Sequence, residues 1–499
     1  MKWSAILLAH GALTLSLSAS AQEGELTLYG TVLPYVENFR TDGATAEGLT
    51  PETGGATQVT LDDYTGDNLP NRFRMTSGTS NIGFRGLLKL SKHFNAFFQI
   101  ENAVGPDGDP YILASAWASR NSAVGVKSSS FGTLFFGNWD TPYKHPTLFV
   151  GPIRGLNPFD NAITGNPGFN VPVTTTRNGR DSARHDAAFN RRQGNSIQYW
   201  TPSFVGLSAR VAVSLNEGRT RKEFDPSISP VLWSTLVSFE HGPFAVHYGY
   251  EQHLDYFGTD WVGGSPGATF ANPSSKDDGH EVVAWYEFPT RTRLAVVLER
   301  LTYRTDDTVV GAVNGYQREA VYGALRQHLG DHAVWGAFGV ANPGRCTTVG
   351  GLPCTTNGLD GMQWSVGYTY SPVKTFDIYA SYAEVSNGRS GMYGEFPPVA
   401  TIAPGSTTYS FGVGFLFTFE ASVALGGAGK PQEKPAATRE PDEAAPAPEP
   451  EAPKAPAPPA ADEPPAADEP EPDAAEAPPV EPAEPPPAAQ PEEPAAPQP

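Results

Sequence analysis

The chain has 499 residues, a formal charge of −20, 52 glycines, 48 prolines and 2 cysteines. It is too long for one ordinary globular core and is very rich in turn-forming residues. Its acidic balance gives no reason to expect a nucleic-acid partner. Most of the negative charge lies in the tail, because the residues from Gly427 onward include roughly 17 acidic and 4 basic side chains.

The first 21 residues are typical of a secretory signal peptide. Lys2 supplies a basic start, an apolar run extends to Leu17, and Ala19-Ser20-Ala21 forms a cleavage site of small residues. We therefore expect a mature chain that begins near Gln22 and lies outside the cytoplasm. No later stretch reaches the ~20 consecutive apolar residues that a membrane helix requires.

Between Glu25 and Phe419, apolar and polar side chains alternate in segments of about ten residues, as expected for strands with two unlike faces. The last segment has large apolar side chains at every second position: Tyr409, Phe411, Val413, Phe415, Phe417 and Phe419. Short turns alternate with longer loops along this region. This arrangement predicts about sixteen antiparallel strands, an even number of the kind found in outer-membrane barrels.

The polar faces of these segments distinguish a transmembrane barrel from a water-soluble β-sandwich. In a sandwich the apolar face is buried, and loop lengths need not alternate. Here the polar faces carry charges and the apolar faces carry aromatic side chains near the strand ends, which fits water inside and lipid outside. The expected fold is all-β: a transmembrane antiparallel β-barrel of about 16 strands over residues 22–426. The last strand should pair with the first, so that its apolar face contacts hydrocarbon.

The two cysteines, Cys346 and Cys354, lie in a loop rich in glycine, threonine and proline. In an exported chain this spacing favours a small loop disulfide, with two free thiols as the alternative. No histidine lies nearby, so a metal site is not expected there.

Residues 427–499 form a Pro/Ala/Glu-rich segment with almost no large apolar side chains. Such a segment cannot bury a core and is expected to be disordered. With an even strand number, both barrel ends of the chain should lie on the periplasmic side. The tail is then either an acidic segment without a defined partner or a semi-extended spacer that contacts cell-wall material.

Several short motifs resemble, in chain order, the general bacterial porins of Gram-negative outer membranes. They are LTLYG at 26–30, SNIGFRG at 80–86, SRNSAVGV at 119–126, GNWDTP at 137–142 and GFLFTF at 414–419. The resemblance implies a homotrimer of sixteen-stranded barrels surrounded by outer-membrane lipid and lipopolysaccharide. It also implies a pore through which ions and small hydrophilic solutes diffuse, narrowed by an inward-folded third loop. The small residues Ala123 and Gly125, read as outward-facing, are consistent with a subunit contact.

In such porins an arginine cluster on the wall faces acidic groups of the third loop. By position, Arg120 and Arg192 match two wall arginines, Asn81 stands in place of a third, and Asn138 replaces another. Residues 140–191 form the longest interior loop and are the natural segment to narrow the lumen. The candidate constriction residues are Arg120, Arg192, Arg85, Asn81, Asp160, Asp181, Asp186, Arg180 and Arg184.

Basic residues outnumber acidic ones in this loop, which favours a mild preference for anions. The alternative is that some of these arginines are exposed and paired locally. The expected function is passive diffusion, with a specific channel for small anionic solutes and an envelope tether through the tail as alternatives. No enzyme activity, cofactor or metal site is expected, since the chain has no nucleophile elbow and no defensible metal-ligand spacing.

Overall fold

The computed structural model describes residues 23–45, 68–108, 117–151, 162–166, 168, 188–215, 230–255, 275–306, 310–311, 313–394 and 403–425. The expected signal peptide and the acidic tail lie outside these residues. Within the described ranges, no helix is long and apolar enough to cross a membrane. The described residues include a short 3-10 helix, η3 (His145–Phe149).

The strands join neighbours in one antiparallel sheet. In chain order they are β1 (Gly24–Val32), β2 (Tyr35–Asp42), β3 (Arg72–Thr76), β4 (Asn81–Lys89), β5 (Asn95–Ala103), β6 (Ser122–Ser128), β7 (Gly132–Asp140), β8 (Arg192–Trp200), β9 (Leu207–Ser214), β10 (Val231–His241), β11 (Phe244–Leu254), β12 (Ser275–Glu287), β13 (Thr292–Thr305), β14 (Val313–Leu329), β15 (His332–Ala341), β16 (Arg345–Thr348), β17 (Gly361–Val373), β18 (Phe376–Asn387) and β19 (Thr407–Leu425).

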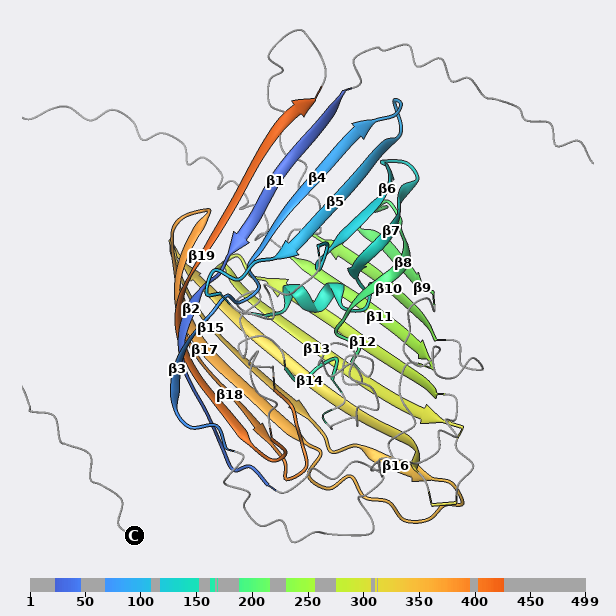
Figure 1. Cartoon of the computed structure of the whole chain (residues 1–499), viewed down its shortest axis with the longest axis vertical. Helices are drawn as coiled ribbons and strands as arrows, with labels where there is room; N and C mark the ends of the chain where they lie inside the picture. The colour runs from blue at the N-terminus through green and yellow to red at the C-terminus, as the bar shows by residue number, and fades with distance from the viewer. Residues whose placement is uncertain are drawn as a thin grey trace, which may run out of the picture. The chain divides into compact units, whose positions relative to one another are not determined.

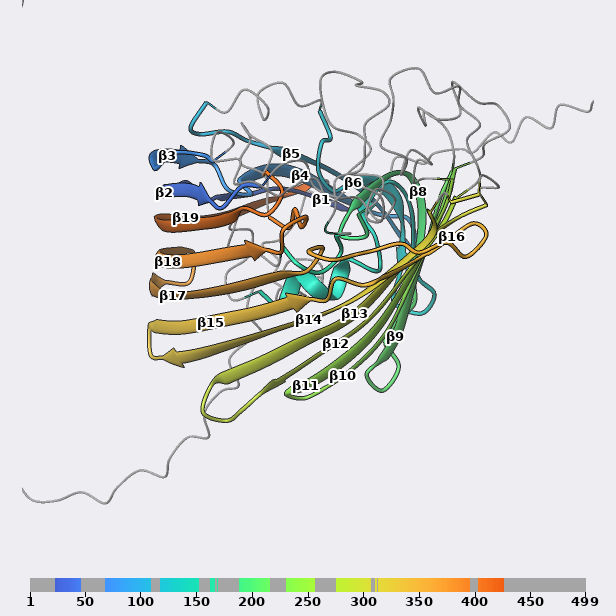
Figure 2. The same ribbon diagram turned by 90° about the horizontal axis from the view of Figure 1, so that it is seen from below.

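The sheet closes on itself as a barrel with 16 strand positions. Three short segments do not count as separate strands of the barrel. β2 continues β1, β3 continues β4 and β16 continues β15, each beside the same neighbouring strand. Figure 2 shows the strands curving around η3, which lies inside the barrel. The predicted fold class and strand number are confirmed.

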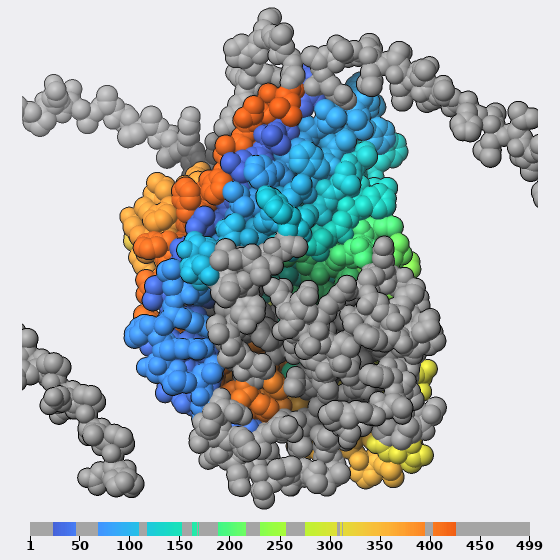
Figure 3. All heavy atoms as spheres, viewed as in Figure 1, coloured from blue at the N-terminus to red at the C-terminus, as the bar shows by residue number. Residues whose placement is uncertain are grey.

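The barrel closes where the first strand meets the last. Gly24 of β1 is opposite Leu425 of β19, and the pairing runs without a gap to Val32 opposite Phe417. In Figure 3 the atoms of β19 (orange) lie directly beside those of β1 (dark blue). The predicted pairing of the last strand with the first is confirmed, so neither strand has an open edge along this stretch.

The first strand is interrupted where proline replaces a backbone donor. Pro34 separates β1 from β2, since proline has no N–H and cannot donate to the sheet. The neighbouring N–H of Leu33 instead donates to the Ser80 hydroxyl, at 2.8 Å, in the matching interruption between β3 and β4. The short turns at Gly242 and Gly330 are tight because both glycines adopt a positive φ angle.

The two faces of the sheet differ as the alternation predicts. On β19, Phe411 and Phe415 are 52% and 49% exposed on the outer face, whereas inward-facing Ser410 is 1% exposed. Aromatic rings gather near the short turns, where Phe94 stacks on Phe131 with 5.7 Å between ring centroids. The barrel therefore presents an apolar outer surface with aromatic rings near its end.

One detail of the sequence interpretation is wrong. Ala123 and Gly125 face inward, because their neighbours Val124 and Val126 are the exposed residues of β6. These small residues therefore cannot form part of an outer subunit contact.

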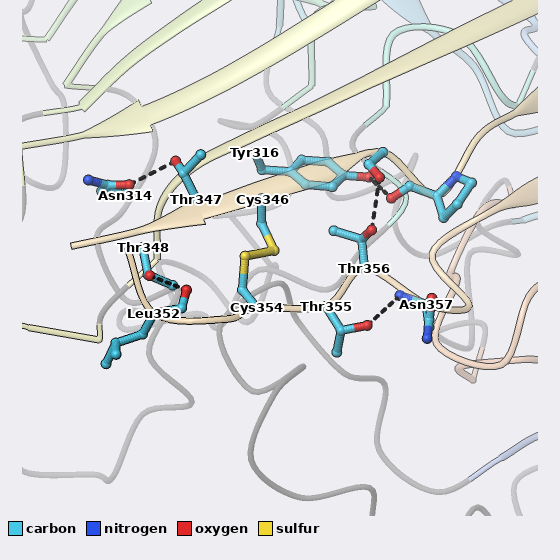
Figure 4. The surroundings of a disulfide bond; sticks show 12 residues. Asn314, Tyr316, Cys346, Thr347, Thr348, Leu352, Cys354, Thr355, Thr356 and Asn357 are labelled. Carbon is cyan, nitrogen blue, oxygen red and sulfur yellow. Dashed lines mark hydrogen bonds between the residues drawn. A yellow bond between two sulfur atoms is a disulfide. The ribbon is translucent and has the colours of Figure 1, made fainter. Parts of the chain in front are cut away.

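A disulfide joins Cys346 of β16 to Cys354, with 6.1 Å between the Cα atoms. Figure 4 shows the bond beside the ring of Tyr316, whose hydroxyl donates to the Pro343 carbonyl at 3.2 Å. Both cysteines pack against the buried cluster that includes Tyr303 and Tyr316. The disulfide thus fastens the loop between β15 and β17 to the inner wall of β13 and β14.

Replacing both cysteines with serine is expected to loosen this loop without opening the barrel. Closing a loop with a sequence separation of 8 contributes about 2–3 kcal/mol in the chain-entropy account. Amide hydrogen exchange should therefore accelerate over 345–360 and stay unchanged in β13. A general acceleration around the barrel would show instead that the bond supports the whole fold.

Candidate functional site

The segment between β7 and β8, residues 141–191, is called loop 3 here, and its described parts lie inside the barrel. Val150, which follows η3, is buried against inward-facing Val283 and Tyr322 of β12 and β14. Ile163 is fully buried in a second cluster that includes Ala320 and Val385. These strands lie across the lumen from β7, so the loop reaches the opposite wall. Figure 1 shows η3 as the coiled ribbon near the middle of the view.

A buried ion pair holds loop 3 to that wall. Glu299 of β13 and Arg318 of β14 pair at 2.9 Å, and both side chains are fully buried. Glu299 also accepts hydrogen bonds from the Tyr143 hydroxyl at 2.9 Å and from the Gly165 amide at 2.7 Å. Arg318 donates to the Ile163 carbonyl at 3.1 Å and to the Asn166 carbonyl. Two separate parts of loop 3 therefore converge on one charge pair.

Tyr143 is suited to its role as a donor in this contact. Burial raises the pKa of its phenol well above the ordinary value, and the neighbouring Glu299 raises it further. The phenol therefore keeps its proton at neutral pH and can donate to the carboxylate. A third anchor lies beyond it, because the Ala162 amide donates to the side chain of Gln363 at 2.8 Å.

A second charged group lies at the base of loop 3, on the wall formed by β5 to β8. Arg120 pairs with Glu101 at 2.5 Å. Asp140 forms ion pairs with Arg192 at 3.3 Å and with Lys144 at 3.0 Å. Asn121 directly follows Arg120 in the chain; its side-chain amide donates to Asp140 at 2.9 Å, and its side-chain oxygen accepts from Arg192 at 2.7 Å. We call Glu101, Arg120, Asn121, Asp140, Lys144 and Arg192 the wall cluster.

The structure brings together only part of the predicted constriction. Arg120 and Arg192 both belong to the wall cluster, and the Asn138 amide donates to the Arg120 carbonyl at 3.1 Å. Arg85 lies lower on the wall, over the Tyr29 ring at 5.3 Å, and pairs with Glu420 at 2.9 Å. The Asn81 side chain donates to the nearby Thr79 carbonyl at 3.1 Å and makes no described contact with the wall cluster.

Five of the predicted constriction residues lie outside the described residues. They are Asp160, Arg180, Asp181, Arg184 and Asp186. Their placement in the pore stays a prediction.

Sequence reasoning missed the residues that hold the loop. Glu101 and Glu299 occupy polar positions of the alternating segments, but nothing near them in the sequence indicates their partners. Arg318 carries a usable signal, because it is a charged residue at an inward position between Tyr316 and Ala320. Its pairing with a loop about 150 residues earlier in the chain leaves no local pattern.

The described part of the site consists of fixed charges and packed side chains. In the described ranges, no group of three or more histidine, cysteine, aspartate or glutamate side chains is placed to hold a metal ion. The interior offers fixed charges and a partly occupied lumen, which can act on a passing solute through field and size.

A closed barrel with an apolar exterior, a charged interior and a loop folded into the lumen defines a transmembrane β-barrel protein. A family model for Gram-negative porins matches residues 4–390. The chain therefore belongs to the Gram-negative porin family, whose members are outer-membrane proteins, and the resemblance found in the sequence motifs is confirmed.

Relatives and a solved structure agree with this assignment. The chain is 27% identical over 246 residues to the major outer membrane protein P.IB of Neisseria meningitidis serogroup A, which aligns 49% of this chain with 59% of that relative. It is 25% identical over 307 residues to the P.IA protein of the same strain, covering 55% and 71% of the two chains. The match thus spans about three-fifths of P.IB. The anion-selective porin of Comamonas acidovorans has the same fold, with a TM-score of 0.54, 18% identity, and coverage of 80% of this chain and 100% of that one.

Proposed function

We propose that this porin forms a water-filled channel for passive diffusion of ions and small hydrophilic solutes, with loop 3 as its constriction. The observation that carries this proposal is the Glu299–Arg318 pair, which holds loop 3 against the far wall of the lumen. A barrel of this strand number would otherwise enclose a wide aqueous channel. A loop anchored at both sides narrows that channel without closing it.

The wall cluster gives the constriction a weak preference for anions. It contains three basic side chains against two carboxylates: Arg120, Lys144 and Arg192 against Glu101 and Asp140. Each arginine is paired, so most of the positive field is neutralised locally. The residual positive charge lies at the foot of loop 3, where a solute passes closest to the wall, and favours anions modestly.

Reconstitution in planar bilayers tests this function. Purified protein should produce ohmic current steps, and a salt gradient should give a small reversal potential of anionic sign. Block by one anionic solute at low concentration, without block by others of the same size, would favour the alternative of a substrate-specific channel. Bilayers that stay non-conducting with folded protein inserted would exclude both.

We further propose a homotrimer whose protomers carry the acidic tail on the periplasmic side. The first and last strands end together at the short-turn end of the barrel, where Gly24 is opposite Leu425. A tail leaving from that end extends toward the cell wall if the long loops face outward.

Deletion of residues 427–499 is expected to leave single-channel conductance unchanged, because β1 and β19 close the barrel within residues 24–425. If the tail tethers the membrane to the cell wall, the deletion should increase vesicle release and detergent sensitivity in cells. Normal envelope integrity in the deletion strain would exclude the tether. Unheated gel electrophoresis of the purified protein tests the proposed trimer.

A further inference from the structure

The inner wall of β5 to β8 carries a cluster of aromatic rings. Phe135 lies in its centre, with its ring centroid 6.1 Å from that of Phe97, 5.1 Å from that of Trp139 and 5.0 Å from that of Trp200. All three contacts are edge-to-face, the arrangement that aromatic pairs prefer. The rings point into the lumen, because the alternate residue Phe136 is 50% exposed on the outer face. Aromatic side chains here do not serve the lipid contact.

Two cations lie over these rings. The Lys127 ammonium is 4.4 Å from the centroid of Phe97, and the Arg210 guanidinium carbon is 4.1 Å from the centroid of Trp200. Both distances are within the range of cation–π attraction. The aromatic and basic side chains line one cavity of about 200 Å³, together with the polar groups of Gln99, Thr133, Ser203 and Ser208.

We propose that this cavity binds small aromatic carboxylates, that is, a planar apolar ring bearing one anionic group. The aromatic walls provide edges and faces that complement a ring. A guanidinium stacked on an indole still directs its N–H groups in its own plane, where carboxylate oxygens bind. Hydroxyl groups of Thr133, Ser203 and Ser208 offer further donors to the same anion.

Other solute classes fit less well. An aromatic cation would be repelled by the positive charges of Lys127 and Arg210, and a neutral aromatic molecule would form no ion pair with them. An aliphatic carboxylate would keep the ion pair but lose the ring contacts. The inference rests on the proposed function only in that the lumen is the path by which solutes reach the cavity.

The cavity lies on the same wall as the wall cluster. Trp139 directly precedes Asp140, and Gln99 is two residues before Glu101 on β5. The lining residues Thr201 and Ser203 belong to the short turn after β8. A carboxylate that passes the wall cluster toward the short-turn end of the barrel therefore meets this cavity next.

A second arginine–tryptophan pair provides a matched control. Arg293 of β13 lies over Trp285 with its guanidinium carbon 4.7 Å from the ring centroid. Trp285 packs near Phe149 of loop 3, with 5.9 Å between ring centroids, and neither residue lines the cavity. Arg293→Gln removes the same charge from the lumen as Arg210→Gln does, but leaves the cavity intact.

The test compares three probes on the wild-type channel: benzoate, cyclohexanecarboxylate and benzylammonium. Benzoate should reduce the open-channel current at the lowest concentration. Arg210→Gln and Trp200→Leu should each raise the half-blocking concentration of benzoate about tenfold, as expected from loss of one charged hydrogen bond or one ring contact. Arg293→Gln should shift it by less than about twofold.

Binding in detergent solution separates this inference from the channel proposal. Saturation-transfer NMR should detect benzoate bound to the purified wild-type protein. The signal should be much weaker with Arg210→Gln or Lys127→Gln. This measurement does not require a conducting channel. Equal block by all three probes, or unchanged benzoate binding in these variants, would overturn the site and identify the rings as packing alone. Non-conducting bilayers together with normal benzoate binding would overturn only the channel.

Discussion

Arg318→Met should release loop 3 from the far wall and increase the mean open-channel current and its noise. The substitution leaves Glu299 buried without its cation and removes the donors to the Ile163 and Asn166 carbonyls. Breaking a buried charge pair in this way costs about 3–5 kcal/mol. The cost falls on the contact between loop and wall, because the strand pairing of β13 and β14 does not involve the guanidinium. Single-channel recordings at fixed salt concentration measure the effect.

Arg326→Met is the matched control for this experiment. Arg326 is a further inward-facing arginine on β14, and it has no described contact with loop 3. Its replacement should leave the current noise close to that of the wild type. Adding Glu299→Gln to Arg318→Met should recover part of the lost stability, since no unpaired charge then remains buried. An unchanged current in Arg318→Met would mean that loop 3 does not limit conduction.

The double substitution Arg120→Glu with Arg192→Glu should move the reversal potential toward cations. Each change removes a positive charge and adds a negative one beside an existing carboxylate, Glu101 or Asp140. Lys144 is then the remaining cation of the wall cluster, so the local field reverses its sign. Measurement in a salt gradient at low ionic strength gives the largest effect, because salt screens exposed charges.

A charge reversal outside the lumen controls for general effects of charge. Arg300 pairs with Glu319 on the outer face, where its side chain is 57% exposed. Arg300→Glu should leave the reversal potential unchanged. The milder pair Arg120→Gln with Arg192→Gln should shift it in the same direction by a smaller amount. If the selectivity of both double variants equals that of the wild type, these arginines lie outside the conduction path.

The barrel was predictable because its main determinant is local. Alternation of apolar and polar side chains places Phe411 and Phe415 outside and Ser410 inside, and each strand repeats this rule. The rule failed on β6, where small residues alternate with valine and either face could have been outward. A Cβ at Gly125 would lie 2.4 Å from the Leu134 carbonyl oxygen and 2.5 Å from the Phe135 Cβ, so glycine is required at this inward position by packing that the local pattern does not reveal.

The site was less predictable because its contacts are distant in sequence. Arg120 and Arg192 could be named from motifs, but their partners Glu101 and Asp140 are defined by strand register. The anchor of loop 3 joins Tyr143 to Glu299 across 156 positions. The aromatic cavity leaves no such signal, since Phe97 and Phe135 are adjacent to Phe98 and Phe136, and alternation alone does not say which ring of each pair faces the lumen.

Liposome swelling in sugars of graded size tests the central claim most directly. If the lumen is an aqueous path narrowed by loop 3, swelling rates should fall steeply with increasing solute size and be equal for stereoisomers of one mass. Liposomes that contain folded protein and still exclude the smallest sugars, or that admit one stereoisomer and not another, would contradict passive diffusion.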